Sequence, residues 1–86
     1  MKTHNLKCEP PFFEDVTEGR KPFEVRRNDR GYRVGDVLRL HRFTVEEGYT
    51  PDTPPTIRHV SYMLEGVEWG LRAGFCVLGL TTEAPA

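Results

Sequence analysis

The sequence predicts an α+β domain that is mainly β: a small, partly closed barrel of five to six strands with one short N-terminal helix. Seven Pro and eight Gly among 86 residues divide the chain into short segments, which suits strands and tight turns better than a helix bundle. Several segments alternate apolar and polar residues, the period of a half-buried strand. A chain this short makes one domain, 1–86, with a thin core. We place that core at residues 4–80 and a tail at 81–86.

The first part of the chain predicts a short strand followed by a short helix. A strand begins at residues 6–8 and ends where two prolines follow. Proline suits the first turn of a helix, whose N–H groups have no partner within the helix. Phe13 and Val16 then fall on one side, with acidic residues on the other. We expect an amphipathic helix over residues 10–18, with Gly19 just past its end.

The next segment, residues 21–27, predicts a half-buried strand. Its residues alternate, with Phe23 and Val25 on one face and Glu24 and Arg26 on the other. This is the pattern of a strand that turns its apolar side chains to the core and its charged side chains to solvent.

Three more strands are predicted further along. One spans residues 37–43, with Leu38 and Leu40 facing inward. The others span residues 56–64 and 75–80, and the last is apolar on both faces, which predicts a central position in the sheet. The residues between them are rich in turn-forming types.

Basic charge is concentrated in one part of a chain whose net charge is −1. Residues 20–42 hold eight cations against three acids, a net +5, which predicts an anionic partner. The overall pI near 6.3 argues against a protein that binds nucleic acids non-specifically over its whole surface. Any electrostatic binding must therefore come from this local patch. The cations are Arg20, Lys21, Arg26, Arg27, Arg30, Arg33, Arg39 and Arg42.

Lys21, Glu24 and Arg26 are the leading candidates for a ligand site. Arg offers a planar fork for bidentate contacts and Lys a point charge, while a carboxylate could accept hydrogen bonds from the amine of a base. Strand parity places Lys21 and Arg26 on opposite faces, unless a bulge intervenes between them. The alternative is that all three are solvated charges on an exposed strand.

The neighbouring polar residues have two readings as well. Arg27, Arg30, Arg33 and Arg39 would form an outer basic surface that neutralises phosphates. Asn28 either joins that surface or caps the turn that follows the strand.

Two aromatic residues fall in predicted connections. Tyr49 lies in a long irregular stretch, residues 44–55, and Trp69 lies between the last two strands. Either ring could stack on an unpaired base, and the two connections could converge on one cleft, or each ring could close an end of the barrel. Tyr62, within a strand, is expected in the core.

No cofactor and no metal site are expected. Cys8 and Cys76 are read as buried, inert thiols, although a disulfide between them stays possible, and no Cys and His spacing fits a metal. The chain has no apolar run of membrane-spanning length and no secretory signal at its start. We therefore expect a cytoplasmic protein without a membrane partner, as a monomer or weak dimer.

Several motifs together resemble one family. The most specific is Phe23-Glu24-Val25-Arg26-x-Asn28-Asp29-Arg30, supported by Gly19-x-Lys21, Val34-Gly35-Asp36-x-Leu38, Gly48-Tyr49-Thr50 and Gly70-Leu71-x-x-Gly74-Phe75. With these the chain resembles, over residues 4–80, the domain of unknown function 3850 family of phages and bacteria. The resemblance implies an ASCH-related branch of the PUA-like superfamily, a pseudo-barrel, an RNA or nucleoside ligand and, for a phage protein, the host cytoplasm.

Three functions follow as hypotheses. The first is a module that binds RNA or a modified or unpaired nucleobase in a basic cleft. The second is a hydrolase acting on a modified nucleoside or RNA, with Lys21 and Glu24 as its catalytic residues. The resemblance implies the chemistry of small ASCH amidohydrolases, which use a Lys, a Thr three residues later and a distant Glu on N4-acetylcytidine. Here Lys21 matches, but Glu24 replaces the Thr, and Glu65 or Glu68 would have to be the distant acid. The third is a phage protein that binds a host protein.

Overall fold

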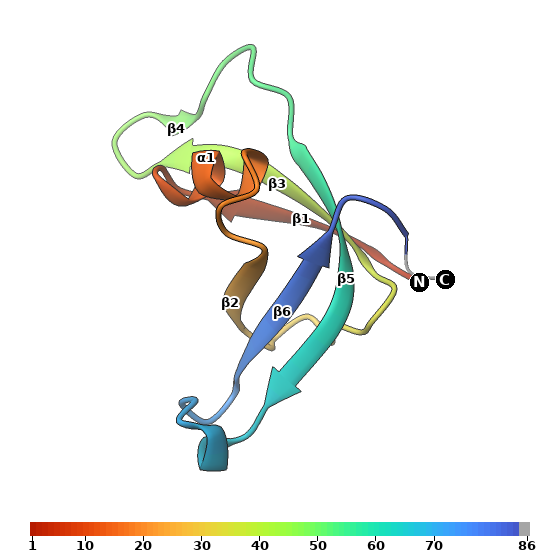
Figure 1. The fold of residues 1–86 in the computed structure, drawn as a ribbon. Coiled ribbons are helices and arrows are strands. Elements are labelled where there is room, and N and C mark those ends of the chain that lie inside the picture. The colour runs from red at the N-terminus through yellow and green to blue at the C-terminus, as the bar shows by residue number, and fades with distance from the viewer. Residues whose placement is uncertain (85–86) are drawn as a thin grey trace.

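One mixed six-stranded sheet forms the fold, with one short α-helix beside it (Figure 1). The structure is a computed structural model that describes residues 1–84. It confirms a small, mainly β domain with a single short α-helix. The elements in chain order are β1 (Thr3–Cys8), α1 (Phe12–Thr17), β2 (Phe23–Arg27), β3 (Val37–Thr44), β4 (Gly48–Tyr49), β5 (Thr56–Glu65), the 3₁₀ helix η1 (Val67–Trp69) and β6 (Phe75–Thr81).

The strands follow the order β1-β3-β5-β6-β2, with β4 paired to β3. β1 runs parallel to β3 and the other pairs are antiparallel. β1 and β2 are therefore the two edges, and within residues 1–84 they do not pair with each other, so the sheet is not closed. Two arginine side chains reach across instead: Arg26 Nη2 donates to the carbonyl of Lys7 at 2.6 Å and Arg30 Nη1 to that of Asn5 at 3.2 Å. We call this gap between β1 and β2 the seam.

The core lies between the sheet and α1. Leu38 and Leu40 are fully buried, as their strand pattern predicts, and β6 is central in the sheet. Both cysteines are buried, as predicted, and both are free thiols, so no disulfide joins them. The buried apolar residues are Leu6, Cys8, Phe13, Val16, Tyr32, Leu38, Leu40, Val60, Cys76, Leu78 and Leu80.

The helix α1 is shorter than predicted. It spans Phe12–Thr17, and the two prolines lie in the turn before it rather than in its first turn. Phe13 and Val16 are buried as expected, and Gly19, with φ of 86°, follows the helix in the left-handed conformation that glycine adopts at little cost.

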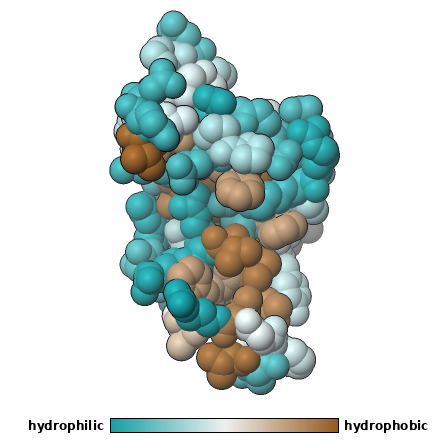
Figure 2. Space-filling view, turned by 90° about the vertical axis from the view of Figure 1, so that its left-hand side faces the viewer, coloured by the Kyte–Doolittle hydropathy of each residue, from teal (hydrophilic) through white to brown (hydrophobic). Residues whose placement is uncertain are grey.

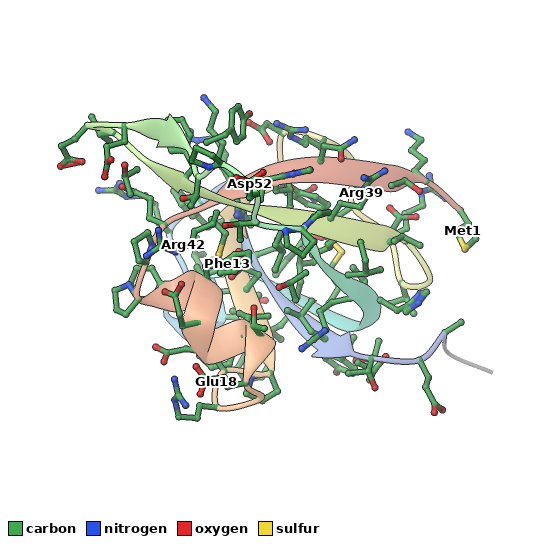
Figure 3. All side chains as sticks on the ribbon, turned by 90° about the horizontal axis from the view of Figure 1, so that it is seen from above. Met1, Phe13, Glu18, Arg39, Arg42 and Asp52 are labelled. Atoms are coloured by element: carbon green, nitrogen blue, oxygen red, sulfur yellow. The ribbon has the colours of Figure 1, made fainter. Side chains whose placement is uncertain are left out.

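The acids of α1 and its C-cap residue Glu18 are engaged within the molecule. Glu14 Oε2 accepts from Arg42 Nε at 2.6 Å, and Arg42 reaches from β3 toward the helix (Figure 3). Asp15 and Glu18 both pair with Arg20 at 2.9 Å. Two of the eight cations of the basic stretch are thus balanced by the helix.

The predicted orientation of β2 is wrong. Glu24 is only 4% exposed, whereas Phe23 and Val25 are 41% and 50% exposed. The reason lies in the neighbouring strand, because Glu24 stands opposite Leu78, which β6 turns into the core. Residues paired across an antiparallel ladder share a face, so the charged side of β2 points inward.

Tyr62 was predicted in the core and is instead 67% exposed. The β5–β6 register shifts between Val60 and Tyr62, which face the adjacent residues Leu80 and Gly79. Such a bulge reverses the alternation of side chains after Val60. Gly79 accommodates it, since a Cβ there would lie 3.2 Å from the Cβ of Tyr62.

The outer face of β2, β6 and β5 is consequently apolar. Phe23, Val25 and Tyr62 are exposed on it, and Leu64 and Val77 are partly exposed. Figure 2 shows hydrophobic side chains gathered over the lower half of the molecule, where Figure 1 places β2 and the connection between β5 and β6.

A buried polar cluster holds β1 against the turn before β3. Asp36 accepts hydrogen bonds from His4 Nε2 at 2.8 Å and from the backbone N–H groups of Lys2 and Arg33, each at 3.0 Å. Burial alone would raise the pKa of Asp36, but these three donors hold that pKa below its usual value. The ring of Tyr32 packs edge-on against His4 at 4.8 Å.

The expected tail is partly ordered structure. β6 extends through Thr81, whose hydroxyl donates to the carbonyl of Glu83 at 2.6 Å. Residues 85–86 of the predicted tail lie outside the described residues.

Candidate functional site

A cavity of about 500 Å³ opens in the seam, between the last residues of β1 and the charged face of β2. We call it the seam pocket. It draws its walls from both edge strands, from α1 and from β3, so segments far apart in the sequence meet there. Its lining residues are Lys7, Cys8, Glu9, Phe12, Lys21, Glu24, Val25, Arg26, Arg27 and Phe43.

The buried carboxylate of Glu24 organises the pocket. Lys21 Nζ donates to Oε1 at 3.0 Å and Arg26 Nε donates to Oε2 at 2.9 Å. Lys21 precedes the first residue of β2, so strand parity does not apply to it, and the expectation that Lys21 and Arg26 point to opposite faces is wrong. The three leading candidates of the sequence analysis form one contiguous charged cluster.

Arg26 has a second role because its guanidinium divides its donors between two partners. Nε serves Glu24, while Nη2 serves the carbonyl of Lys7 across the seam. The planar fork of arginine can make both bonds at once, which a lysine ammonium at the end of a flexible chain does not reproduce.

Aromatic rings flank the charges. Lys21 Nζ lies 5.0 Å from the ring centroid of Phe12 and 5.2 Å from that of Phe23, and Lys7 Nζ lies 4.5 Å from the centroid of Phe43. Each ammonium is within the range of a cation–π contact. Phe12, which is exposed, and Phe43 give the pocket two apolar surfaces at its mouth.

Cys8 contributes a thiol rather than a nucleophile. Burial, together with the negative charge of Glu24, raises the pKa of Cys8 to about 11, although Arg26 and Lys21 act in the opposite direction. The neutral thiol therefore predominates at neutral pH, and it acts as a small apolar group in the pocket wall.

The structure divides the other candidate residues. Arg27 lines the pocket and lies 5.1 Å over the ring of Phe75. Arg30 spans the seam. Asn28 is bonded within the molecule: its Oδ1 accepts from the N–H of Tyr32 at 3.1 Å and its Nδ2 donates to Glu65 at 3.2 Å.

Arg39, Tyr49 and Trp69 lie outside the seam pocket. Arg39 is exposed on the side of β3 away from the core, whereas Phe13 lies between α1 and the strands (Figure 3). Tyr49 packs edge-on against Phe43 at 5.3 Å. Trp69, in η1, is at the opposite end of the molecule from β4 (Figure 1), so the expected convergence of the two aromatic connections is wrong.

Sequence reasoning missed Lys7, Cys8, Phe12 and Phe43. Their common property is a place in the lining of the seam pocket, which the fold assembles from separate elements and no local pattern encodes. Phe43 had a usable signal, because it continues the outward alternation of Arg39 and His41 on the same strand.

A second cavity, of about 540 Å³, lies between α1 and the start of β5. Its one cation, Arg58, already donates through Nη2 to the carbonyls of Val16 and Thr17 at 3.0 and 3.2 Å. The seam pocket, with four cations and a buried acid in its lining, is therefore the stronger candidate.

The chain is similar in sequence to a phage protein and to one protein family. A stretch of 42 residues is 43% identical to the "Uncharacterized 12.9 kDa protein in GpA 3'region" of Escherichia phage P2, covering 49% of this chain and 38% of the phage protein. No helix in residues 1–84 is long and apolar enough to cross a membrane. Residues 3–80 match the family described as "Domain of unknown function (DUF3850)". Since that match covers nearly the whole chain, the protein belongs to the DUF3850 family.

Proposed function

We propose that this protein binds RNA by holding one unpaired or modified nucleobase in the seam pocket. The observation that carries the proposal is the buried carboxylate of Glu24, fixed between Lys21 and Arg26 beside the rings of Phe12 and Phe43. A carboxylate only accepts hydrogen bonds and a guanidinium only donates them. Together they suit a base edge that carries both kinds of group, while the rings suit its flat face.

The charge of the pocket favours a ligand that brings a phosphate. Its lining holds four cations, Lys7, Lys21, Arg26 and Arg27, against two acids, Glu9 and Glu24. The net charge of +2 is local, within a chain whose total is −1. A nucleotide supplies the matching negative charge beside its base.

We further propose that the fold is an ASCH-type branch of the PUA-like architecture. The support is the motif resemblance together with the position of the two edge strands, which face each other across a seam spanned by side chains. A barrel that stops just short of closure would have this arrangement.

Hydrolysis of a modified nucleoside is a second candidate for the same pocket. The observation in its favour is the contact of Lys21 Nζ with Glu24 at 3.0 Å inside a cavity, a geometry suited to proton transfer. The acids proposed as the distant partner do not line the pocket: Glu65 bonds Asn28, and Glu68 lies in η1. Glu9 is the other acid in the lining.

Fluorescence anisotropy with a labelled single-stranded RNA pool, at two salt concentrations, tests the binding proposal. We expect binding that weakens with salt and that falls about 10-fold or more in Arg26→Ala, which loses a charge-assisted contact. Arg33→Ala is the matched control, because Arg33 is exposed and its side chain makes no ion pair within residues 1–84. Equal affinity of wild type and Arg26→Ala would overturn the proposal.

Incubation with N4-acetylcytidine, followed by chromatography of the products, tests the hydrolase alternative. Lys21→Arg separates the two functions, since a binding site keeps most of its affinity with the conserved charge, whereas a proton-transferring lysine cannot be replaced by arginine. Absence of turnover in the wild-type protein would exclude this substrate.

A further inference from the structure

A second polar and aromatic surface adjoins the seam pocket, on the outer side of β1 and β3. The register of this parallel pair sets Asn5 beside Arg39 and Lys7 beside His41, all with side chains away from the core. His41 Nε2 and Asn5 Oδ1 lie 2.9 Å apart, which fixes the imidazole on this side. With Phe43 and Tyr49, these residues form what we call the β1–β3 face.

The aromatic end of this face is an exposed cluster. Tyr49 is 59% exposed, and its ring meets Phe43 at 5.3 Å and His41 at 6.0 Å, both edge-on. The hairpin pairing of Phe43 with Tyr49 holds the two rings together. Exposed aromatic rings on a sheet are the usual platform on which unpaired bases stack.

The cations of this face are not neutralised by ion pairs. Arg39 and Lys7 are exposed and make no ion pair within residues 1–84, and Arg30 lies at the adjoining seam on the carbonyl of Asn5. The acids nearest in sequence are Asp36, which is buried and bonded to His4, and Glu9, which lines the seam pocket, while Glu46 and Glu47 lie in the hairpin turn before Tyr49. That turn therefore limits the surface at one end and leaves the cations free for phosphates.

The face and the pocket are continuous because Lys7 and Phe43 belong to both. A ligand whose base occupies the pocket would leave it over these two residues and meet Tyr49, His41 and Arg39 next. A free nucleoside reaches none of these three, so the pocket alone gives them no role.

We propose that the β1–β3 face binds the nucleotides adjoining the base in the pocket, so that the natural ligand is a single-stranded oligonucleotide rather than a free nucleoside. This inference rests on the proposed function. A base within a duplex is stacked and paired, and would have to be extruded to enter the pocket, whereas a single strand can offer one base to the pocket and stack the next on Tyr49.

The test is the dependence of affinity on ligand length. RNAs of one, two, four and eight nucleotides with a common 5′ label are titrated against the wild-type protein. We expect the octamer to bind about 10-fold or more tightly than the mononucleotide, because one further stacked base and a phosphate contact contribute on that scale. Tyr49→Ala and Arg39→Ala should each remove much of this gain and leave mononucleotide binding unchanged.

Matched variants elsewhere serve as controls. Tyr62→Ala removes an equally exposed tyrosine from the outer face of β5, and Arg33→Ala removes an exposed arginine from the turn before β3. Both should bind the octamer as the wild type does. Because the side chain of Arg39 is on the surface, Arg39→Ala still tests the inference if Tyr49→Ala disturbs the β3–β4 hairpin. Circular dichroism checks that each variant is folded.

The outcomes separate the two proposals. Equal affinity for mononucleotide and octamer, or wild-type octamer binding by both Tyr49→Ala and Arg39→Ala, overturns the oligonucleotide inference. In that case the proposal of a nucleobase site in the seam pocket is retained if Arg26→Ala lowers the affinity for ligands of every length. Absence of binding at every length overturns both.

Discussion

Glu24 and Arg26 share the inner face of β2, and Nε of Arg26 donates to Oε2 of Glu24 at 2.9 Å. Residues two apart on a strand point to the same side of the sheet, so the sequence alone brings these two side chains together. Their burial depends on the rest of the fold. The side chain of Glu24 is 5% exposed and that of Arg26 23%. Glu24 thus needs both its cations, because a buried carboxylate without partners is costly.

Glu24→Gln should lower the stability of the fold as well as the affinity for the proposed ligand. The amide keeps the size of the side chain but carries no charge, so both Lys21 and Arg26 lose a charged partner, and one of them also faces an NH₂ donor in place of an accepting oxygen. We expect a loss of about 2 kcal/mol in the free energy of unfolding, seen as a lower urea midpoint at an unchanged m-value. A midpoint equal to that of the wild type would show that both cations are solvated without Glu24.

The reversed orientation of β2 is testable with two identical substitutions. Val25→Thr adds a hydroxyl at a half-exposed site and should change stability by less than about 0.5 kcal/mol. Val60→Thr adds it at a fully buried site and should cost about 1–3 kcal/mol. The measurement is urea unfolding of the two variants side by side. A larger loss of stability for Val25→Thr than for Val60→Thr would show that Val25 faces the core, as the sequence predicts, and would contradict the orientation described here.

Acid should weaken the fold through Asp36. The pKa of its carboxyl is lowered in the folded state, so between the folded and unfolded pKa values the unfolded chain binds more protons and stability falls as pH falls. The contribution is complete above an unfolded value of about 3.9 and is lost as pH drops through the folded pKa.

Unfolding curves of Asp36→Asn between pH 7 and pH 2.5 would measure this contribution. The variant should be less stable than the wild type at pH 7, and the difference should shrink toward pH 2.5. Asp52→Asn is the control: Asp52 is exposed, with φ of 56°, a conformation that Asn tolerates well. A constant difference between Asp36→Asn and wild type at all pH values would contradict the assignment.

Cys8 should resist thiol reagents while the protein is folded. A pKa of about 11 against an ordinary 9.0 leaves roughly 100-fold less thiolate at pH 8, and burial also hinders access. Reaction with a chromogenic disulfide should proceed only with unfolding, for Cys8 and for buried Cys76 alike. Peptide mapping after brief labelling identifies the modified residue, and rapid native labelling of Cys8 would show that the seam pocket opens to the reagent.

Local patterns predicted the elements well, but not which way all of them face. The strands near residues 37–43, 56–64 and 75–80 and the helix were found because alternation and helical spacing are local properties. The side of β2 that faces the core was not predicted, because it is set by the pairing of β2 with β6. The apolar character of β6 on both faces held the missing clue, since its outward residues need apolar neighbours on the next strand.

The candidate site was predicted in part. Lys21, Glu24 and Arg26 are adjacent in sequence and could be singled out by their charge. Lys7 and Phe43 join them only because β1 runs parallel to β3, a long-range pairing that a single sequence does not specify. Tyr62 was misplaced by one bulge, since a single extra residue on β5 reverses every side chain beyond it.

The seam is also the place where the sheet is held together by side chains rather than by backbone hydrogen bonds. Elsewhere in the sheet, neighbouring strands are joined by repeated backbone hydrogen bonds. Across the seam the links are two arginine side chains, which can exchange partners by rotamer changes that leave every strand pair intact. The gap can therefore change its width without the loss of a strand pair, so the part of the sheet held by side chains alone coincides with the candidate binding pocket.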